Sequence, residues 1–338
     1  MINFKNDYST IAHPKILEAM VKYNENTYIG YGLDEMSNKA KEAIKKYISN
    51  DVDIHFLVGG TSANKIVIAH SLRPYEAVIS VKTGHICVHE TGAIESTGHR
   101  IIEVEGVDGK VTPEVIKKAV KTHTDEHMVH PKMVYITQAT ELGTVYSKEE
   151  LIEISNTCKQ HALYLFVDGA RLAVALDKSD ITLDDLAKYS DVYYIGGTKN
   201  GAMLGEAVVI SDEKIKKNFR YSIKQNGGMY AKGFVAGIQF HELFKDGLYF
   251  ELGKHSNEMA HTLSEGLIDR GFELACDNVT NQIFVKVSNE LYEKLFDFVL
   301  FELWEDLGNS KVIRLVTNYT TTINDIENFL VCLDKTNK

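Results

Sequence analysis

The sequence is poor in cysteine, in long apolar runs and in positive charge, and each shortage argues against a class of protein. Its four cysteines lie far apart without a C-x-x-C pair, which disfavours a disulfide framework or a zinc site. No apolar run approaches the roughly 18 residues of a membrane span, and the first residues lack the apolar core of a signal peptide. The formal net charge of -10 disfavours nucleic acid and anionic lipid as partners. We therefore expect a cytoplasmic protein whose partner is a small molecule.

The apolar residues that are present predict a sheet covered by helices. At 44% hydrophobic content, the 338 residues can bury a large core. Short apolar runs alternate with amphipathic stretches, which is typical of strand and helix units that build a parallel sheet. Helices are expected to begin at Pro14, at Pro113 and after a capping box formed by Ser147 and Glu150.

The pattern changes after residue 235, where residues 282–287 and 311–317 alternate like strands of a smaller unit. We predict an α/β fold with a large, mostly parallel sheet domain over residues 1–235 and a smaller α+β domain over residues 236–338. Residues 1–13 are expected to pack with the smaller domain.

Three expected strands, residues 54–58, 163–167 and 192–195, each lead into a polar loop that contains glycines. Asp168 follows the second strand and Lys199 closes the loop after the third. Because ligands bind beyond the carboxyl ends of strands in an open parallel sheet, we expect these three loops to form one site.

Gly60 and Thr61 follow the first of these strands and suit a phosphate. Glycine lets backbone amides approach a ligand, and the helix that follows turns its positive end towards it. A tight turn with Thr61 as the helix N-cap fits the same residues. Neither G-x-G-x-x-G nor G-x-x-x-x-G-K-[ST] occurs here, so a single phosphate is favoured over a nucleotide.

Asp168 needs a positive partner, because a carboxylate at the end of an apolar strand loses its hydration. The protonated ring nitrogen of pyridoxal 5'-phosphate (PLP) is one such partner. Arg171, three residues further on, is the other, and the sequence leaves both open.

Lys199 lies just beyond an apolar strand, where lysine is rare unless its amine is used. Burial beside other cations lowers the pKa of a lysine, which suits a Schiff base with the PLP aldehyde. Thr198 could then donate to the phosphate. A surface lysine in a glycine-rich turn is the alternative.

His85 and Arg314 extend this pattern. His85 follows another apolar run and could stack on the cofactor ring or move a proton, or it is simply packed. His89 is four residues away, but no third ligand is evident, so no metal site is expected. Arg314 interrupts an alternating strand and needs a carboxylate, which either an amino-acid substrate or the protein itself would supply.

These motifs, in this order and spacing, resemble the threonine aldolase and β-eliminating lyase family of PLP enzymes over nearly the whole chain. The motifs are Gly60-Thr61-x-Ala63-Asn64, His85, Asp168-Gly169-Ala170-Arg171, Thr198-Lys199 and 312–317. The resemblance implies a fold-type-I architecture and a homodimer or homotetramer whose active sites are shared between subunits.

The resemblance also implies roles for single residues. Lys199 matches the lysine that bonds the cofactor, and Asp168 the partner of its ring nitrogen. His85 matches the residue stacked on the ring, and Gly60 with Thr61 the phosphate cradle. Arg171 and Arg314 match arginines at the cofactor and at the substrate carboxylate. Tyr31 matches a tyrosine delivered from the neighbouring subunit, and ordinary interface packing is the alternative for this residue.

Three segments depart from the family pattern. The usual Glu-Asn-Thr-His is here 138–141, ending in Glu141, and the usual Arg-Ser-Asp-Thr is 5–8, which contains Asn6. A motif that normally carries a phosphate-binding arginine offers only Lys232 as a substitute. Recognition of the substrate side chain is therefore expected to differ.

The resemblance implies retro-aldol cleavage of L-threonine or L-allo-threonine to glycine and acetaldehyde. His85, Glu141 or a water would take the proton from the β-hydroxyl. Other PLP reactions at Cα, namely β-elimination, racemisation or transamination, use the same scaffold, because the bond that breaks depends on substrate orientation. A PLP-binding protein without activity is the alternative from another class.

Overall fold

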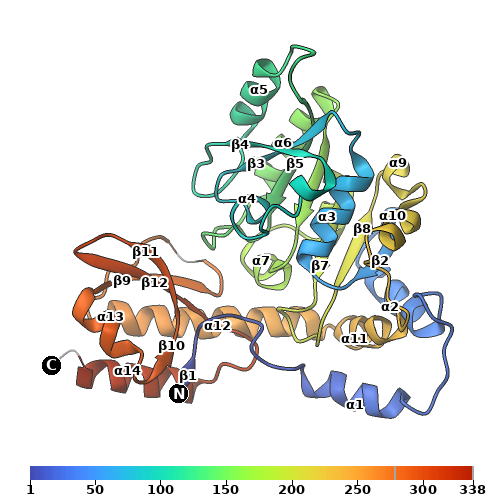
Figure 1. Cartoon of the computed structure of the whole chain (residues 1–338). Helices are drawn as coiled ribbons and strands as arrows, with labels where there is room; N and C mark the ends of the chain where they lie inside the picture. Colours follow the sequence, from blue (N-terminus) through green and yellow to red (C-terminus); the bar gives the residue numbers. More distant parts are fainter. Residues whose placement is uncertain (278, 337–338) are drawn as a thin grey trace.

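Within residues 1–277 and 279–336, which the computed structural model describes, seven strands form a central sheet in the order β2-β8-β7-β6-β5-β3-β4 (Figure 1). Strand β8 runs antiparallel to both neighbours and the other strands share one direction. All strands except β8 therefore end at the same edge of the sheet. The strands are β2 (Asp53–Leu57), β3 (Glu76–Val81), β4 (Arg100–Val104), β5 (His130–Thr137), β6 (Tyr164–Asp168), β7 (Val192–Gly196) and β8 (Glu206–Ile210).

Helices cover both faces of this sheet. Successive side chains along a strand point to opposite faces, so both faces contribute buried residues. On β7, Tyr193 and Ile195 face one core, whereas Val192 and Tyr194 face the other. One face is covered by α3 (Gly60–Ser71), α4 (His85–Val88), α9 (Glu213–Lys216) and α10 (Phe219–Gln225). The opposite core includes residues of α1 (Pro14–Tyr23), α2 (Glu35–Lys45), α5 (Pro113–Thr122), α6 (Lys148–Gln160), α7 (Leu172–Lys178), α8 (Leu183–Tyr189) and α11 (Phe234–Lys245). The predicted α/β fold and the predicted starts of α1, α5 and α6 are confirmed, including the capping box of Ser147 and Glu150.

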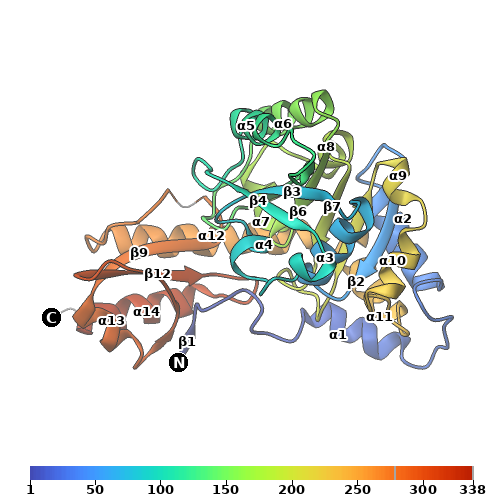
Figure 2. The ribbon, with the colours of Figure 1, turned by 45° about the horizontal axis from the view of Figure 1, so that its top comes forward.

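A second, smaller unit lies at the C-terminal end of the chain. Its antiparallel sheet has the order β11-β12-β9, and the long helix α12 runs from the large sheet into it, as two views show (Figures 1 and 2). The chain begins in this unit, because β1 pairs with β10 and Phe4 belongs to its core. The elements are β1 (Ile2–Asn3), α12 (Leu248–Ile268), β9 (Gln282–Ser288), α13 (Asn289–Leu295), β10 (Val299–Leu300), β11 (Glu302–Asp306), β12 (Ser310–Val316) and α14 (Ile323–Thr336), and a 3-10 helix spans Glu95–Thr97 near β4.

The division between the two cores falls inside α12. Helix α11 packs against α2, and Phe240 and Leu252 belong to the core of the large sheet. From Met259 onwards, α12 contributes to the core of the smaller unit instead. The change of pattern after residue 235 thus precedes this division, and we propose that the domain boundary lies within α12.

Of the four free cysteines only Cys158 is buried, whereas Cys87, Cys276 and Cys332 are half-buried. In the described part of the chain, no helix combines the length and the apolar character needed to cross a membrane.

Candidate active site

A cleft of about 920 Å³ opens at the edge where the parallel strands end, and the loops after β2, β6 and β7 all line it. The predicted convergence of these three loops is confirmed. The cleft also receives residues of the N-terminal segment and of β11 and β12 from the smaller unit. The predicted site residues that line it are Asn6, Gly60, Thr61, His85, Glu141, Arg171, Thr198, Lys199 and Arg314.

Asp168 ends β6 in a buried position, and four donors surround its carboxylate. The hydroxyl groups of Tyr194 and Tyr135 donate to Oδ1 and Oδ2 at 2.5 Å each. The amide of Asn64 donates to Oδ2 and the backbone N–H of Ala170 to Oδ1, both at 3.0 Å. These bonds replace the hydration that burial removes, so the carboxylate is held in one orientation at the end of the strand.

Arg171 does not pair with Asp168, so this alternative is wrong. Its Nε and Nη2 donate to the two oxygens of Asp7, at 2.8 and 3.1 Å, in a buried bidentate pair. Burial alone would raise the pKa of Asp7, but the charges of Arg171 and Lys199 and the hydrogen bonds from Arg171 and Asn281 lower it to about 2. The pair fixes the N-terminal segment against the edge of the large sheet.

Lys199 follows β7 and lies in the cleft with its Nζ 6.0 Å from the centre of the Tyr8 ring. Burial and the charge of Arg171 lower the pKa of this lysine, while Asp7, Glu141 and Asp168 oppose the shift. The lower pKa increases the fraction of neutral amine, which is the form that attacks a carbonyl carbon.

The N-terminus of α3 opens into the same cleft at Gly59, Gly60 and Thr61. The helix begins at Gly60, and Gly59 occupies the N-cap position without a side-chain cap, so Thr61 as N-cap was a wrong alternative. The first backbone N–H groups of a helix have no partner within it, which makes this end suited to an anion. A Cβ atom at Gly60 would lie 2.9 Å from the Tyr194 hydroxyl, so a larger residue would displace the hydroxyl that donates to Asp168.

His85 begins α4 and is held by a buried carboxylate. Its Nδ1 lies 2.8 Å from Oε1 of Glu90, and the Asn64 amide donates to the same oxygen at 2.7 Å. Burial lowers the pKa of His85, but the bond to Glu90 and the charges of Asp168 and Glu141 outweigh this effect and raise it. Asn64 thereby links the imidazole to Asp168, and Nε2 is left as the nitrogen that can exchange a proton with a ligand. No group of three or more potential metal ligands occurs among the described residues.

Arg314 projects from β12 of the smaller unit towards the cleft. Its guanidinium carbon lies 5.4 Å from the centre of the Trp304 ring, and Nη1 donates to Gln282 at 3.4 Å. Nε is buried without a partner, and within residues 1–277 and 279–336 no carboxylate lies at ion-pair distance. Because this half-buried guanidinium has a buried Nε that lacks an acceptor, the residue is suited to a ligand carboxylate.

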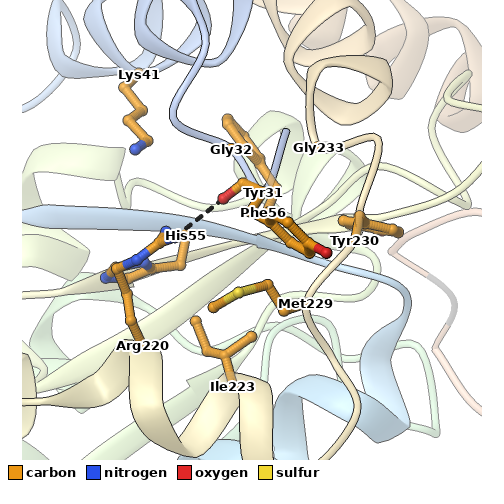
Figure 3. A pocket seen from close by; sticks show the side chains of 10 residues that line it. All are labelled: Tyr31, Gly32, Lys41, His55, Phe56, Arg220, Ile223, Met229, Tyr230 and Gly233. Carbon is orange, nitrogen blue, oxygen red and sulfur yellow. Dashed lines mark hydrogen bonds between the residues drawn. The ribbon is translucent and has the colours of Figure 1, made fainter. Parts of the chain in front are cut away.

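Tyr31 and Lys232 lie outside this cleft. Tyr31 is exposed, and its backbone N–H donates to the carbonyl oxygen of Ala231 at 3.0 Å. Arg220 donates to the Tyr31 carbonyl oxygen at 3.1 Å beside a small second cavity of about 30 Å³ (Figure 3). Tyr31 and the exposed Lys232 thus lie on adjoining segments at the surface, away from the chain's own Lys199.

Several residues that line the cleft or hold its side chains were not predicted from the sequence. Tyr135 and Tyr194 sit inside apolar strands, where a tyrosine is ordinarily core. Their position near the strand ends was the only available signal. The other missed residues are Asp7, whose partner Arg171 is remote in sequence, and Glu90, Glu206 and Trp304, whose partners His85, Thr198 and Arg314 lie nearer along the chain.

The fold and the cleft define an enzyme of the fold-type-I class. The aspartate aminotransferase of Thermus thermophilus (a single mutant) shares this fold, with a TM-score of 0.73 at 16% identity over 99% of this chain and 91% of that one. The chain belongs to the beta-eliminating lyase family, whose model matches residues 3–290. It is 34% identical to a low specificity L-threonine aldolase of Pseudomonas sp. over 295 residues, 86% of this chain and 85% of the relative. The solved structure of a Leishmania major threonine aldolase is 44% identical, with a TM-score of 0.97 and 99% of each chain covered.

The Asp7–Arg171 pair predicts a pH-dependent contribution to stability. Asp7→Asn leaves Arg171 buried without a counterion, so we expect the free energy of unfolding near neutral pH to fall by about 3 kcal/mol. Because the pKa of Asp7 is lowered from 3.8 to about 2 in the folded state, its charge stabilises the fold above pH 3.8 and this effect is lost towards pH 2.

Urea unfolding of the wild type and of Asp7→Asn, between neutral pH and about pH 2, measures the difference in their free energies of unfolding. The exposed Glu126→Gln is a control that should match the wild type. This difference in the free energy of unfolding should stay constant down to about pH 4 and become smaller below it. If the two proteins are equally stable at neutral pH, or if their difference in stability persists unchanged in acid, the ionised pair does not stabilise the fold.

Proposed function

We propose that the protein is a PLP-dependent lyase that cleaves L-threonine or L-allo-threonine into glycine and acetaldehyde. Family membership and the similarity to threonine aldolases support this activity. The observation that carries it is the cleft itself. There Lys199, with its lowered pKa, shares one space with the open end of α3, the His85 imidazole and the unpaired Nε of Arg314, and the charge of the buried Asp168 acts on the lysine.

The residues fit the cofactor that the family implies. Gly60 and Thr61 would hold its phosphate, because the helix end there has free N–H groups and no side-chain cap. Lys199 would bond its aldehyde, His85 would stack on its ring, and Asp168 would face its ring nitrogen. When bound, PLP supplies an electron sink for negative charge at the substrate Cα.

The side chains of this protein would divide the remaining work. Arg314 binds the substrate carboxylate and Arg171, already paired with Asp7, adds positive charge beside it. His85 is oriented by Glu90, so its Nε2 can take the proton from the β-hydroxyl, and Glu141 lies in the same cleft as a second acceptor. Asn6 lines the entrance with the N-terminal segment, where it contacts the substrate side chain.

We further propose that Tyr31 and Lys232 act in the cleft of a neighbouring copy, in a homodimer or homotetramer. Their exposed positions on adjoining segments, outside the chain's own cleft, support this arrangement. Lys232 would add a positive charge near the neighbour's phosphate site. The cytoplasmic location expected from the sequence stays a prediction.

The activity is tested by following products from L-threonine with PLP-loaded protein. We expect glycine and acetaldehyde in equal amounts. Lys199→Ala should lose the visible absorbance of the bound cofactor and at least roughly 10³-fold in kcat/KM, whereas the exposed Lys121→Ala should retain both. Release of ammonia and a keto acid in place of acetaldehyde would favour β-elimination, and no turnover of any amino acid would leave a silent binder.

Sharing of the site between subunits is tested by mixing two variants, Tyr31→Phe and Lys199→Ala, each first shown to be inactive. A mixed dimer contains one cleft with both native residues, so exchange to equilibrium should restore about a quarter of wild-type activity. Mass-labelled subunits verify that exchange occurs. If exchange is complete and no activity returns, Tyr31 does not serve a neighbouring cleft.

A further inference from the structure

Glu206 is a buried acid that the proposed reaction does not use. It lies beside the loop that carries Lys199. It begins β8 opposite Gly196 of β7, and it lines the cleft together with Thr198 and Lys199. Its Oε2 accepts from the N–H of Gly197 at 2.9 Å, and its Oε1 lies 3.0 Å from the Thr198 hydroxyl oxygen. The acid therefore contacts both residues that precede Lys199.

The surroundings of Glu206 favour its neutral form. No cation lies at ion-pair distance in the described stretches of the chain, and a buried carboxylate without one is costly. Burial raises the pKa of Glu206 to about 8 and Asp168 acts in the same direction, while the bonds from Thr198 and Gly197 and the charge of Lys199 oppose the shift. The other ionisable groups near it are the phenols of Tyr194, Tyr230 and Tyr249, whose own pKa values are raised, so they remain neutral.

The protonation state of Glu206 decides what the Thr198 hydroxyl can do. This hydroxyl has one proton to donate and two lone pairs, and one lone pair accepts the N–H of Gly205 at 3.0 Å. If Glu206 is ionised, it can only accept, so the Thr198 proton is committed to it. If Glu206 is neutral, its own proton fills the second lone pair, and the Thr198 proton is free to turn into the cleft.

We propose that neutral Glu206 is a positioning residue that makes the Thr198 hydroxyl a donor to the phosphate of the cofactor. The inference rests on the proposed function, because it assumes that PLP binds with its phosphate beside Gly60, Thr61 and Thr198. These residues line one cleft with Glu206. An ionised Glu206 would both repel the phosphate and withdraw its donor, whereas the neutral acid removes the repulsion and supplies the donor.

The test compares the affinity of the apoprotein for PLP and for pyridoxal, which lacks the phosphate, between about pH 7 and pH 9.5. In this range the phosphate stays fully ionised, because its second pKa is near 6. Both compounds bond to Lys199 through the same aldehyde, so the ratio of their affinities isolates the phosphate contribution. For the wild type we expect this ratio to fall roughly tenfold as the pH rises through about 8, because the donor is lost.

Three variants separate positioning from a merely structural role. Glu206→Gln keeps the shape, donates permanently to Thr198 and accepts from Gly197, so its ratio should stay high across the range. Thr198→Val removes the donor and should give a low, flat ratio. Thr198→Ser keeps the hydroxyl and should restore the wild-type profile.

The outcomes distinguish this inference from the proposed function. A wild-type ratio that does not change with pH, or a Glu206→Gln profile that falls like that of the wild type, would overturn the role of Glu206. Glu206→Gln that weakens PLP and pyridoxal equally would also overturn it, since the residue would then only support the loop. If neither compound bonds to Lys199 in the wild type, the proposed function itself fails.

Discussion

The carboxylate of Asp168, buried at the end of β6, is the charge around which the cleft is built. Such a group is stable only if several donors replace its lost water, and two tyrosines, one asparagine and one backbone amide do so here. One of these donors extends the hydrogen-bond network, because the amide of Asn64 also donates to Glu90, which holds His85. Through Asn64 and Glu90, one buried acid is thus connected to the imidazole of His85.

The other charged side chains at the cleft come together because the two structural units meet at this edge of the sheet. The N-terminal segment pairs with the smaller unit through β1 and Phe4 and then delivers Asp7 to Arg171 on the large sheet. Arg314 arrives from β12 with its Nε unpaired. Burial and the charge of Arg171 lower the pKa of Lys199, whereas the charge of Asp7, which the N-terminal segment brings, acts in the opposite direction.

Local patterns were sufficient to predict the fold and most of the cleft, because they depend on neighbours in sequence. Alternating apolar runs located the strands, and the loops after β2, β6 and β7 had to meet once these strands were parallel. Partner choice was not predictable in this way. Arg171 pairs with Asp7, which is remote in sequence, rather than with the nearby Asp168. Thr198 is only eight residues from Glu206, but they meet because β8 turns back against β7, and the apolar pattern did not predict this reversal. Such pairs are decided by tertiary packing, which no local spacing encodes.

The central claim is that Lys199, next to the held Asp168, is the residue that bonds the cofactor. Borohydride reduction of PLP-loaded protein makes this reversible link permanent, and peptide mass mapping then locates it. The account predicts a pyridoxyl group on the peptide that contains Lys199 and on no other lysine. A group on another lysine, or none in protein that has demonstrably bound PLP, would contradict it.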